Sequence, residues 1–360
     1  MPSGNPRLCR SAENILSFPH PDPGDVHAAR SLTFAVSGCK FCSFCTTMRS
    51  KLWKPLTIGG FRLSTMDFTL TLSSCMAGNM DFIGRALAPY LTEKLSLPVS
   101  FAGELTWQER ERRFDLGEIQ IVWICGLPYI QKADDPAAQL SLLAAPVMAG
   151  ARYGGKPVYF SDIVVHSRSP YRRFTDLRGA TWGYNEPNSH SGYTTIRYYL
   201  SQHGEGGDYF GRFLESGSHE ASLQMILDGE IDGSAVDSTV LELEIARRPA
   251  LAGQIRVLDT IGPSPIPPWL AHGRLSAELR LDLQQTFWNM HRDAHGRRIL
   301  RKARIARFVP VNDSAYDPLR KMTAEAAVVE FPPEMDLRSK RTPQKAKFGP
   351  VRAFHLLHYH

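Results

Sequence analysis

Short apolar stretches alternate along this chain with longer segments in which apolar residues recur every three or four positions. In the first third, a strand-like stretch at 68–72 precedes a segment, Ile83 to Leu91, whose apolar residues share one helical stripe. A helix over 107–116, ended by Gly117, then leads into a buried strand over 119–125. Such alternation predicts an α/β fold with a mainly parallel sheet.

The second half repeats this pattern. Gly117-Glu118-Ile119 follows a helix, and Gly229-Glu230-Ile231 follows another helix that starts at His219. The repeat indicates two similar lobes. A strand over 157–165 is expected to leave the first lobe, and the segment 259–268 to return to it. Two crossings would allow the lobes to close around a ligand by a hinge motion.

These crossings predict the domain boundaries. We expect residues 66–162 and 264–330 to form lobe 1 and residues 163–263 to form lobe 2. Residues 1–65 are rich in Pro, Gly, Ser and Arg and have little periodicity, which predicts a poorly ordered extension. Residues 331–360 are expected to form a tail.

A polar hexapeptide, Asn188-Ser189-His190-Ser191-Gly192-Tyr193, begins a predicted helix of about three turns that ends near His203. The first N–H groups of a helix have no partner within it, so Ser189 or Ser191 is expected to cap them. Ordinary capping explains these residues as well as a ligand site does. The preceding segment reads as turn, strand and loop, however, and ligands of open α/β sheets bind at the carboxyl ends of strands. The dipole there favours a bound oxyanion.

The distribution of charge excludes a folded nucleic-acid surface. The chain carries a formal net charge of +6, but residues 66–330 hold 28 basic and 31 acidic side chains, so the excess of positive charge lies in the two ends. Nucleic-acid binding requires Lys and Arg clustered on one folded face. An anion site in the acidic middle must therefore use local donors, such as N–H groups and hydroxyls. The sequence also predicts no membrane-spanning helix.

Four of the six cysteines fall in the first 65 residues, and Cys39, Cys42 and Cys45 are spaced as in zinc or iron–sulfur sites. No second paired motif follows that would complete a set of ligands. The three cysteines therefore have two interpretations, a metal site or unliganded thiols. No cofactor is expected. Cys75 and Cys125 lie in apolar, strand-like contexts that predict buried free thiols.

Several segments taken together resemble one family, the phosphate, phosphite and phosphonate-binding subunits of ABC importers, which are type II periplasmic-binding proteins. They are Gly126 to Tyr129, Tyr159 to Asp162, Asp176 to Gly179, Asn188 to Tyr193, Gly217 to Ala221, Val236 to Ser238 and Phe308 to Val311. The resemblance extends from about Met66 to Met322 and implies a two-lobed α/β fold with a ligand cleft between the lobes. The family commonly has Ser-Thr-Ser-Gly-Tyr where this chain has His190 in the middle of the motif.

The resemblance implies which residues hold the anion. Ser189, His190, Ser191 and Gly192 would supply hydroxyls and backbone amides from lobe 2. Tyr129 would donate across the cleft, and Trp107 occupies the position of a frequent aromatic residue. His219, in a pair that resembles the family's Ser-His pair, would face the anion. Apart from the resemblance, Asp237 follows a predicted strand and either caps the next helix or accepts from an amino group or a protonated phosphonate oxygen, and Glu186 is a similar candidate.

Two other functions remain open. Ser189 or Ser191, His190 or His219, and Asp237 are the residue types of a hydrolase, but the sequence contains no nucleophile elbow, phosphate-binding loop, dinucleotide fingerprint or metalloprotease helix. A non-catalytic binder is therefore expected, working as a monomer either with an ABC permease or as a ligand sensor without one.

The start of the chain leaves the compartment open. The segment from Met1 to Phe18 has no basic stretch followed by an apolar one, so no export signal is visible, which departs from the family's extracytoplasmic habit. Synthesis beginning at Met66 is one explanation for the upstream extension. Read as written, the chain is cytoplasmic.

Overall fold

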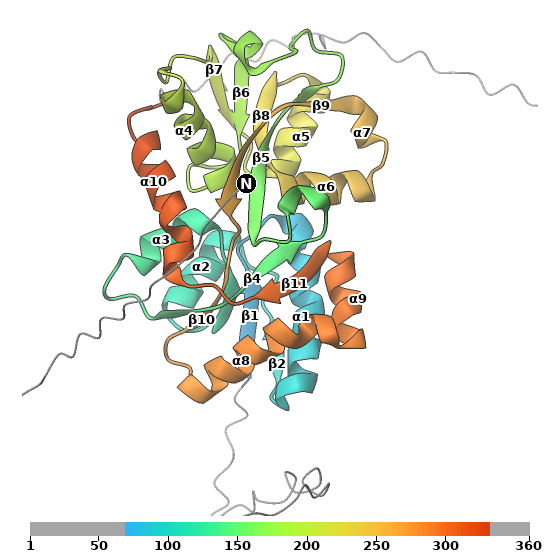
Figure 1. Ribbon diagram of the computed structural model, residues 1–360, viewed down its shortest axis with the longest axis vertical. Helices are drawn as coiled ribbons and strands as arrows, with labels where there is room; N and C mark the ends of the chain where they lie inside the picture. Colours follow the sequence, from blue (N-terminus) through green and yellow to red (C-terminus); the bar gives the residue numbers. More distant parts are fainter. Residues whose placement is uncertain (1–68, 332–360) are drawn as a thin grey trace, which may run out of the picture. The chain divides into compact units, whose positions relative to one another are not determined.

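The computed structural model describes residues 69–331 and shows two mixed β-sheets, each covered by helices on both faces (Figure 1). The expected extension, the expected tail beyond residue 331, Met66 and the three closely spaced cysteines fall outside the described residues. Within the described part of the chain, no helix is both long and apolar enough to cross a bilayer.

The first sheet forms the core of lobe 1, with the strand order β11-β4-β10-β3-β1-β2. Its strands are β1 (Leu70–Ser74), β2 (Val99–Phe101), β3 (Ile121–Trp123), β4 (Leu140–Met148), β10 (Trp269–His272) and β11 (Ile305–Val309). β1 runs parallel to β2 and β3, whereas β10 is antiparallel to β3 and β4, and β11 is antiparallel to β4.

Two apolar clusters cover the faces of this sheet. On one face, α1 (Asp81–Leu95), α8 (Ala277–Asn289) and α9 (Ala294–Lys302) pack their apolar side chains against the strands. On the other face lie α2 (Trp107–Asp115) and α3 (Gly126–Ala133). The buried residues of α1 include Ile83, Leu87 and Leu91, so the predicted stripe is the face that the helix buries.

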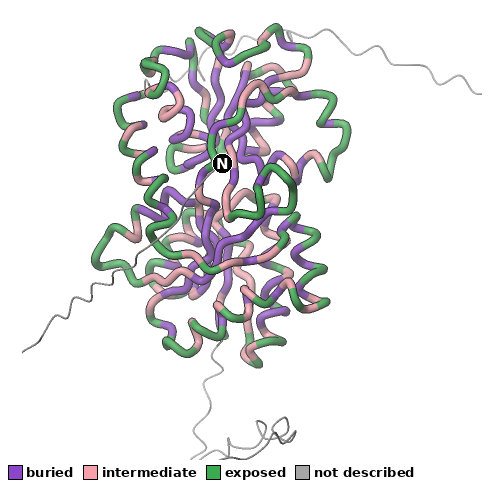
Figure 2. Tube along the Cα trace, in the orientation of Figure 1, coloured by how far each residue is buried: buried purple, intermediate pink, exposed green. Residues whose placement is uncertain are grey.

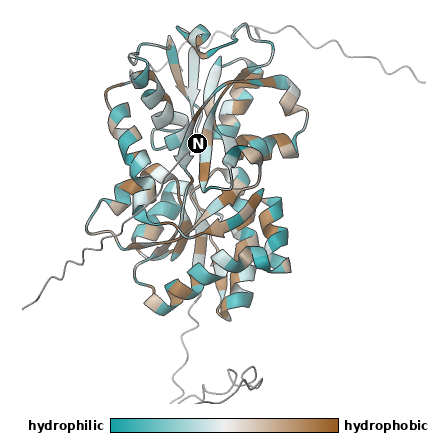
Figure 3. Ribbon diagram, viewed as in Figure 1, coloured by the Kyte–Doolittle hydropathy of each residue, from teal (hydrophilic) through white to brown (hydrophobic). Residues whose placement is uncertain are grey.

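The second sheet forms the core of lobe 2, in the order β7-β6-β8-β5-β9. Its strands are β5 (Val158–His166), β6 (Thr181–Tyr184), β7 (Arg212–Glu215), β8 (Gly233–Asp237) and β9 (Ile255–Pro265). Helix α4 (Thr195–Gln202) packs on one face, and α5 (His219–Asp228), α6 (Ser238–Arg247) and α7 (Leu251–Gln254) pack on the other. The strands are largely buried and the outward faces of the helices are exposed and polar (Figures 2 and 3).

The prediction of a mainly parallel sheet is wrong. In lobe 2, β5 pairs antiparallel with both β8 and β9, and in lobe 1 the strands β4, β10 and β11 form an antiparallel half. Parallel strands need a crossover helix, whereas β5 and β10 enter their sheets directly from the other lobe. These strands are therefore free to pair in the opposite direction.

A third segment also spans the two lobes. Helix α10 (Asp317–Ala326) packs on α3 of lobe 1 and on α4 of lobe 2, as Figure 1 shows at the left of the molecule. Nε of Arg197 donates to the carbonyl oxygen of Val329 at 2.6 Å, and Phe331 packs against Phe213, with ring centroids 4.2 Å apart. The end of the described chain is thereby held on the core of lobe 2.

Short 3-10 helices complete the described fold. They are η1 (Gly78–Met80), η2 (Ala151–Tyr153), η3 (Phe174–Leu177), η5 (Met290–Arg292) and η6 (Asp313–Tyr316). The element η4 (His190–Thr194) is different, because it is one turn of π-helix directly before α4.

Candidate functional site

The polar hexapeptide forms the start of the predicted helix, but its first turn is wider than an α-helical turn. The N–H of Thr194 donates to the carbonyl of Ser189 at 3.1 Å, five residues back, and α4 continues from Thr195. Ser189 is the cap, since its Oγ accepts from the N–H of Gly192 at 3.1 Å. The N–H of Ser191 remains for another partner, whereas the N–H of His190 lies against the thiol of Cys125. Single π-turns of this kind are frequent at functional sites.

Ser191 lies against His219, which is the first residue of α5. The Oγ of Ser191 is 2.9 Å from Nε2 of His219, and both residues are buried. Burial lowers the pKa of His219 to about 4, so its imidazole is neutral near pH 7. Its other ring nitrogen, Nδ1, has no hydrogen-bond partner among the described residues. The structure thus brings two of the predicted site residues together.

His190 turns toward β9 instead. Its Nε2 is 3.1 Å from Oγ of Ser264, and the side chain is fully buried. Burial lowers the pKa of His190 to about 3, so this imidazole is neutral as well. His190 therefore adds no positive charge to the site.

Asp237 and Glu186 supply carboxyl groups near the same position. Asp237 ends β8 and caps α6, because its Oδ1 accepts from the N–H and the hydroxyl of Thr239, each at 2.7 Å. Burial raises the pKa of Asp237 to about 6. Burial, together with the charges of Glu215 and Glu111, raises the pKa of Glu186 to about 7. Both carboxyl groups are thus easier to protonate than exposed ones.

The first turn of α3, in lobe 1, lies near the first turn of η4, in lobe 2. Gly126 of α3 is close to α10 and β9, because a Cβ added there would lie 3.2 Å from Leu319 and 3.9 Å from the carbonyl oxygen of Pro265. The residue before Pro265 is Ser264, which contacts His190. Ser264 in turn donates to Sδ of Met322 in α10 at 3.9 Å. The first turns of α3 and η4, from different lobes, are therefore neighbours across β9 and α10.

Cys125, Tyr159 and Asn185 are residues at this junction that sequence reasoning missed. Cys125 is half-buried at the N-cap of α3, not inside a strand, so the expectation of a buried strand thiol is wrong. Burial raises the pKa of the Cys125 thiol to about 11, while the backbone N–H groups of His190 and Leu127 oppose this rise. Tyr159 is buried on β5 beside Ser191, and its hydroxyl has no hydrogen-bond partner among the described residues. Its place in a resembling segment was the only available signal.

The ligand contacts expected of Tyr129 and Trp107 stay predictions, and both residues have partners in lobe 1. The hydroxyl of Tyr129 donates to Oδ1 of Asp313 at 2.7 Å, and its ring packs on Tyr316 with centroids 4.5 Å apart. The main-chain oxygen of Trp107 accepts from the thiol of Cys75 at 3.6 Å. The hydroxyl of Tyr129 therefore donates within lobe 1, between α3 and η6, and not across to Ser191.

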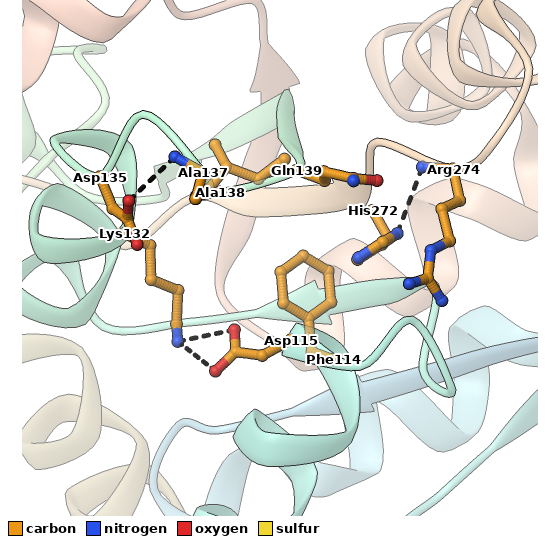
Figure 4. Close-up of a pocket in the computed structure, with 10 residues that line it drawn as sticks. Phe114, Asp115, Lys132, Asp135, Ala137, Ala138, Gln139, His272 and Arg274 are labelled. Atoms are coloured by element: carbon orange, nitrogen blue, oxygen red, sulfur yellow. Dashed lines mark hydrogen bonds and ion pairs between the residues drawn. The ribbon is translucent and has the colours of Figure 1, made fainter.

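A separate pocket of about 340 Å³ lies in lobe 1 and is lined by Phe114, Lys132, His272 and Arg274 among others (Figure 4). Two of its polar side chains already have protein partners. Nζ of Lys132 is 2.7 Å from both carboxylate oxygens of Asp115, and Nδ1 of His272 accepts from the N–H of Arg274 at 3.2 Å. The junction at Ser191, where buried polar atoms lack partners in the described part of the chain, is the better candidate site.

Comparison with known proteins gives the family. The sequence profile of the family described as "ABC transporter, phosphonate, periplasmic substrate-binding protein" matches residues 83–316. The phosphonates-binding periplasmic protein of Escherichia coli strain K12 is 23% identical over 239 residues, which are 64% of this chain and 68% of that protein.

Solved structures show the same fold. The binding-protein component of an ABC phosphonate transporter from Pseudomonas aeruginosa has a TM-score of 0.64 at 18% identity, over 72% of this chain and 86% of that one. PhnD1 of Prochlorococcus marinus (MIT 9301) was solved in complex with methylphosphonate. Its TM-score is 0.63 at 17% identity, and the match covers 73% of this chain and 100% of the PhnD1 chain. The two-lobed fold expected from the resemblance is confirmed, and the chain belongs to the family of periplasmic substrate-binding proteins of ABC phosphonate transporters.

Proposed function

We propose that this chain binds a phosphonate without chemical change, holding its oxyanion head at the start of η4 between the lobes, and delivers it to an ABC permease. The observation that carries this proposal is a group of buried polar atoms around Ser191, namely the hydroxyl of Tyr159, Nδ1 of His219 and Oδ1 of Asn185, for which residues 69–331 provide no hydrogen-bond partner. Buried polar groups are normally hydrogen-bonded, so such a group indicates a ligand position.

The available donors are sufficient for useful affinity. A micromolar complex needs about 8 kcal/mol of binding free energy. Each hydrogen bond to a charged group contributes about 1.5–3 kcal/mol. The amide and the hydroxyl of Ser191 and the hydroxyl of Tyr159 are three such donors. All three are uncharged, so the proposed site stabilises the anion with oriented dipoles.

The same geometry supports a binding role over hydrolysis. Ser191 and His219 are spaced like a nucleophile and its base, but Nδ1 of His219 has no carboxylate partner in the described part of the chain. Oδ1 of Asp237 is engaged by Thr239 instead. An imidazole with a pKa of about 4 is also a weak base at neutral pH. The family contains substrate-binding proteins, not enzymes, which supports the same conclusion.

Isothermal titration calorimetry tests the proposal. The full chain is titrated with methylphosphonate, which PhnD1 of Prochlorococcus marinus holds in its crystal structure, and with 2-aminoethylphosphonate, phosphite, phosphate and sulfate. We expect one-to-one binding of at least one phosphonate, no release of inorganic phosphate over hours, and a monomer by light scattering with and without ligand. The absence of heat from every phosphorus oxyanion, or turnover of any of them, would contradict the proposed function.

A further inference from the structure

Cys125 faces the proposed anion position from lobe 1. It is the N-cap residue of α3, and its thiol lies beside the backbone N–H groups of Leu127 and His190. The neighbouring Gly126 lies against Pro265 and α10, and the adjacent Ser264 contacts His190, so the end of lobe 1 that carries the thiol meets the first turn of η4. The thiol is half-buried and is not bonded to another cysteine.

The thiol offers this position little hydrogen bonding. Sulfur is a weak acceptor and S–H a weak donor, so a cysteine here resembles a small apolar residue. Its pKa is raised to about 11, which keeps it neutral near pH 7. The carboxyl groups of Glu186 and Asp237 are close enough to contribute to that rise. They also disfavour a further anionic oxygen beside the sulfur.

The hydroxyl of Tyr159 provides an independent sign of a ligand at the same place. Tyr159 is 1% exposed, and its hydroxyl has no hydrogen-bond partner among the described residues. Burial raises the pKa of this phenol well above its usual value, and Cys125 and Asp237 add to the rise, so the three side chains are neighbours. The phenol is therefore a neutral donor available to a ligand oxygen that lies next to the thiol.

We propose that Cys125 is a specificity-determining residue that favours oxyanions whose phosphorus carries one carbon or hydrogen substituent over inorganic phosphate. This inference rests on the proposed function and narrows its ligand class. A phosphonate or phosphite has three oxygens and one apolar substituent on a tetrahedral phosphorus. The amide of Ser191 and the hydroxyls of Ser191 and Tyr159 serve the three oxygens, and the apolar substituent lies against Sγ of Cys125.

Inorganic phosphate differs from a phosphonate or phosphite only in the fourth substituent on phosphorus, which is an oxygen. On binding, the fourth oxygen of phosphate would lose its hydrogen bonds to water and would contact the sulfur of Cys125, which is only a weak hydrogen-bonding partner. A buried polar atom without a good partner is unfavourable, and sites discriminate strongly by this means. We expect the wild-type chain to bind methylphosphonate at least about tenfold more tightly than phosphate.

Replacing the thiol by a hydroxyl tests the inference. The full chain and its Cys125→Ser and Cys125→Thr variants are titrated with methylphosphonate, phosphite and phosphate at one pH and ionic strength. We expect either hydroxyl variant to reduce the methylphosphonate-to-phosphate affinity ratio about tenfold, mainly through tighter phosphate binding. Cys75→Ser is the matched control, because Cys75 is a half-buried free thiol that contacts Trp107 in lobe 1, and it should leave the ratio unchanged.

The outcomes separate this inference from the proposed function. Cys125→Ala keeps an apolar group at the position and should retain the preference for methylphosphonate. A wild-type chain that binds phosphate as tightly as methylphosphonate, or hydroxyl variants that bind methylphosphonate with an unchanged ratio, would overturn the role of Cys125 and leave the binding function intact. A wild-type chain that binds no phosphorus oxyanion would overturn both.

Discussion

The hydroxyl of Ser191 and the imidazole of His219 meet 2.9 Å apart, although 28 residues separate them in the chain. Each residue belongs to the first turn of a helix, and the two helices, α4 and α5, lie in the same lobe. The contact fixes the orientation of the Ser191 side chain at the first turn of η4. The hydroxyl and the backbone N–H of Ser191 thereby lie at one place in the proposed site.

Removing the Ser191 hydroxyl should therefore weaken ligand binding with little change in folding. Ser191→Ala deletes one of the three proposed donors, and a hydrogen bond to a charged group contributes about 1.5–3 kcal/mol, so we expect methylphosphonate affinity to fall roughly ten- to a hundredfold. Calorimetry measures the change. Ser201→Ala is the matched control on the same helix, since the Ser201 hydroxyl donates to the carbonyl of Tyr198, away from the first turn. Equal effects of both variants would count against the site.

Gly192 should be intolerant of any side chain. A Cβ at this position would overlap Oδ1 of Asn185 and lie 3.2 Å from Cε1 of His219. Overpacking of this kind costs about 1–3 kcal/mol. We expect Gly192→Ala to lower the free energy of unfolding in urea by that amount and to displace His219 from Ser191, which weakens ligand binding too. Gly253→Ala is the control, because nothing lies within 4 Å of a Cβ there. A Gly192→Ala chain with wild-type stability and affinity would refute this packing.

The sequence located the first turn of η4 because its signals are local. A cap serine, a glycine and an apolar stripe suffice to place a helix start, and Ser189 is that cap. Helix α5, with Ser218 as its cap, was found in the same way. The contact between His219 and Ser191 could be expected only from the family resemblance, because no local pattern joins two helix starts.

The other half of the site depends on tertiary contacts that no local pattern records. Tyr159 lies in an apolar strand, and the pattern of apolar and polar residues along a strand does not predict that its hydroxyl has no hydrogen-bond partner among the described residues. Cys125 was assigned to a strand because strand β3 and helix α3 are separated by two residues only. Tyr129 was expected to reach across the lobes, but the acceptor that takes its hydroxyl, Asp313, is 184 residues away.

The buried histidines make the folded state sensitive to acid. The pKa values of His190 and His219 fall from 6.5 to about 3 and about 4, so below pH 6.5 the unfolded chain takes up protons that the folded chain does not. Stability is therefore lost as the pH falls from 6.5, by up to about 1.4 kcal/mol per pH unit for each histidine. Asp237 has the opposite sign, since its pKa rises from 3.8 to about 6, and it offsets part of this loss between those values.

Urea unfolding between pH 4.5 and pH 7.5 measures this dependence. We expect His219→Gln to remove the contribution of His219 and to make the stability curve flatter below pH 6.5. His203→Gln serves as the control, because His203 is exposed at the end of α4 and stacks on Tyr199. Identical slopes for the wild type and His219→Gln would show that His219 is protonated in the folded protein, contrary to its burial.

Asp237 should make ligand affinity depend on pH. Above a pH of about 6 its carboxylate carries a charge beside the proposed anion position, and repulsion between the two then weakens binding. Asp237→Asn removes that charge, while its amide oxygen can still accept from the N–H of Thr239. We expect wild-type affinity for methylphosphonate to fall by up to about tenfold between pH 6 and pH 8 relative to the variant. Ionisation of the ligand itself affects both chains equally, so the ratio of their affinities isolates Asp237.

The matched control is Asp293→Asn, because Asp293 also caps a helix, by accepting from the N–H groups of His295 and Gly296 in α9. It lies in lobe 1, on the sheet face opposite α3, and the affinity ratio of that variant to the wild type should not change with pH. A constant ratio for Asp237→Asn as well would place the oxyanion away from Asp237 and so away from the junction at Ser191.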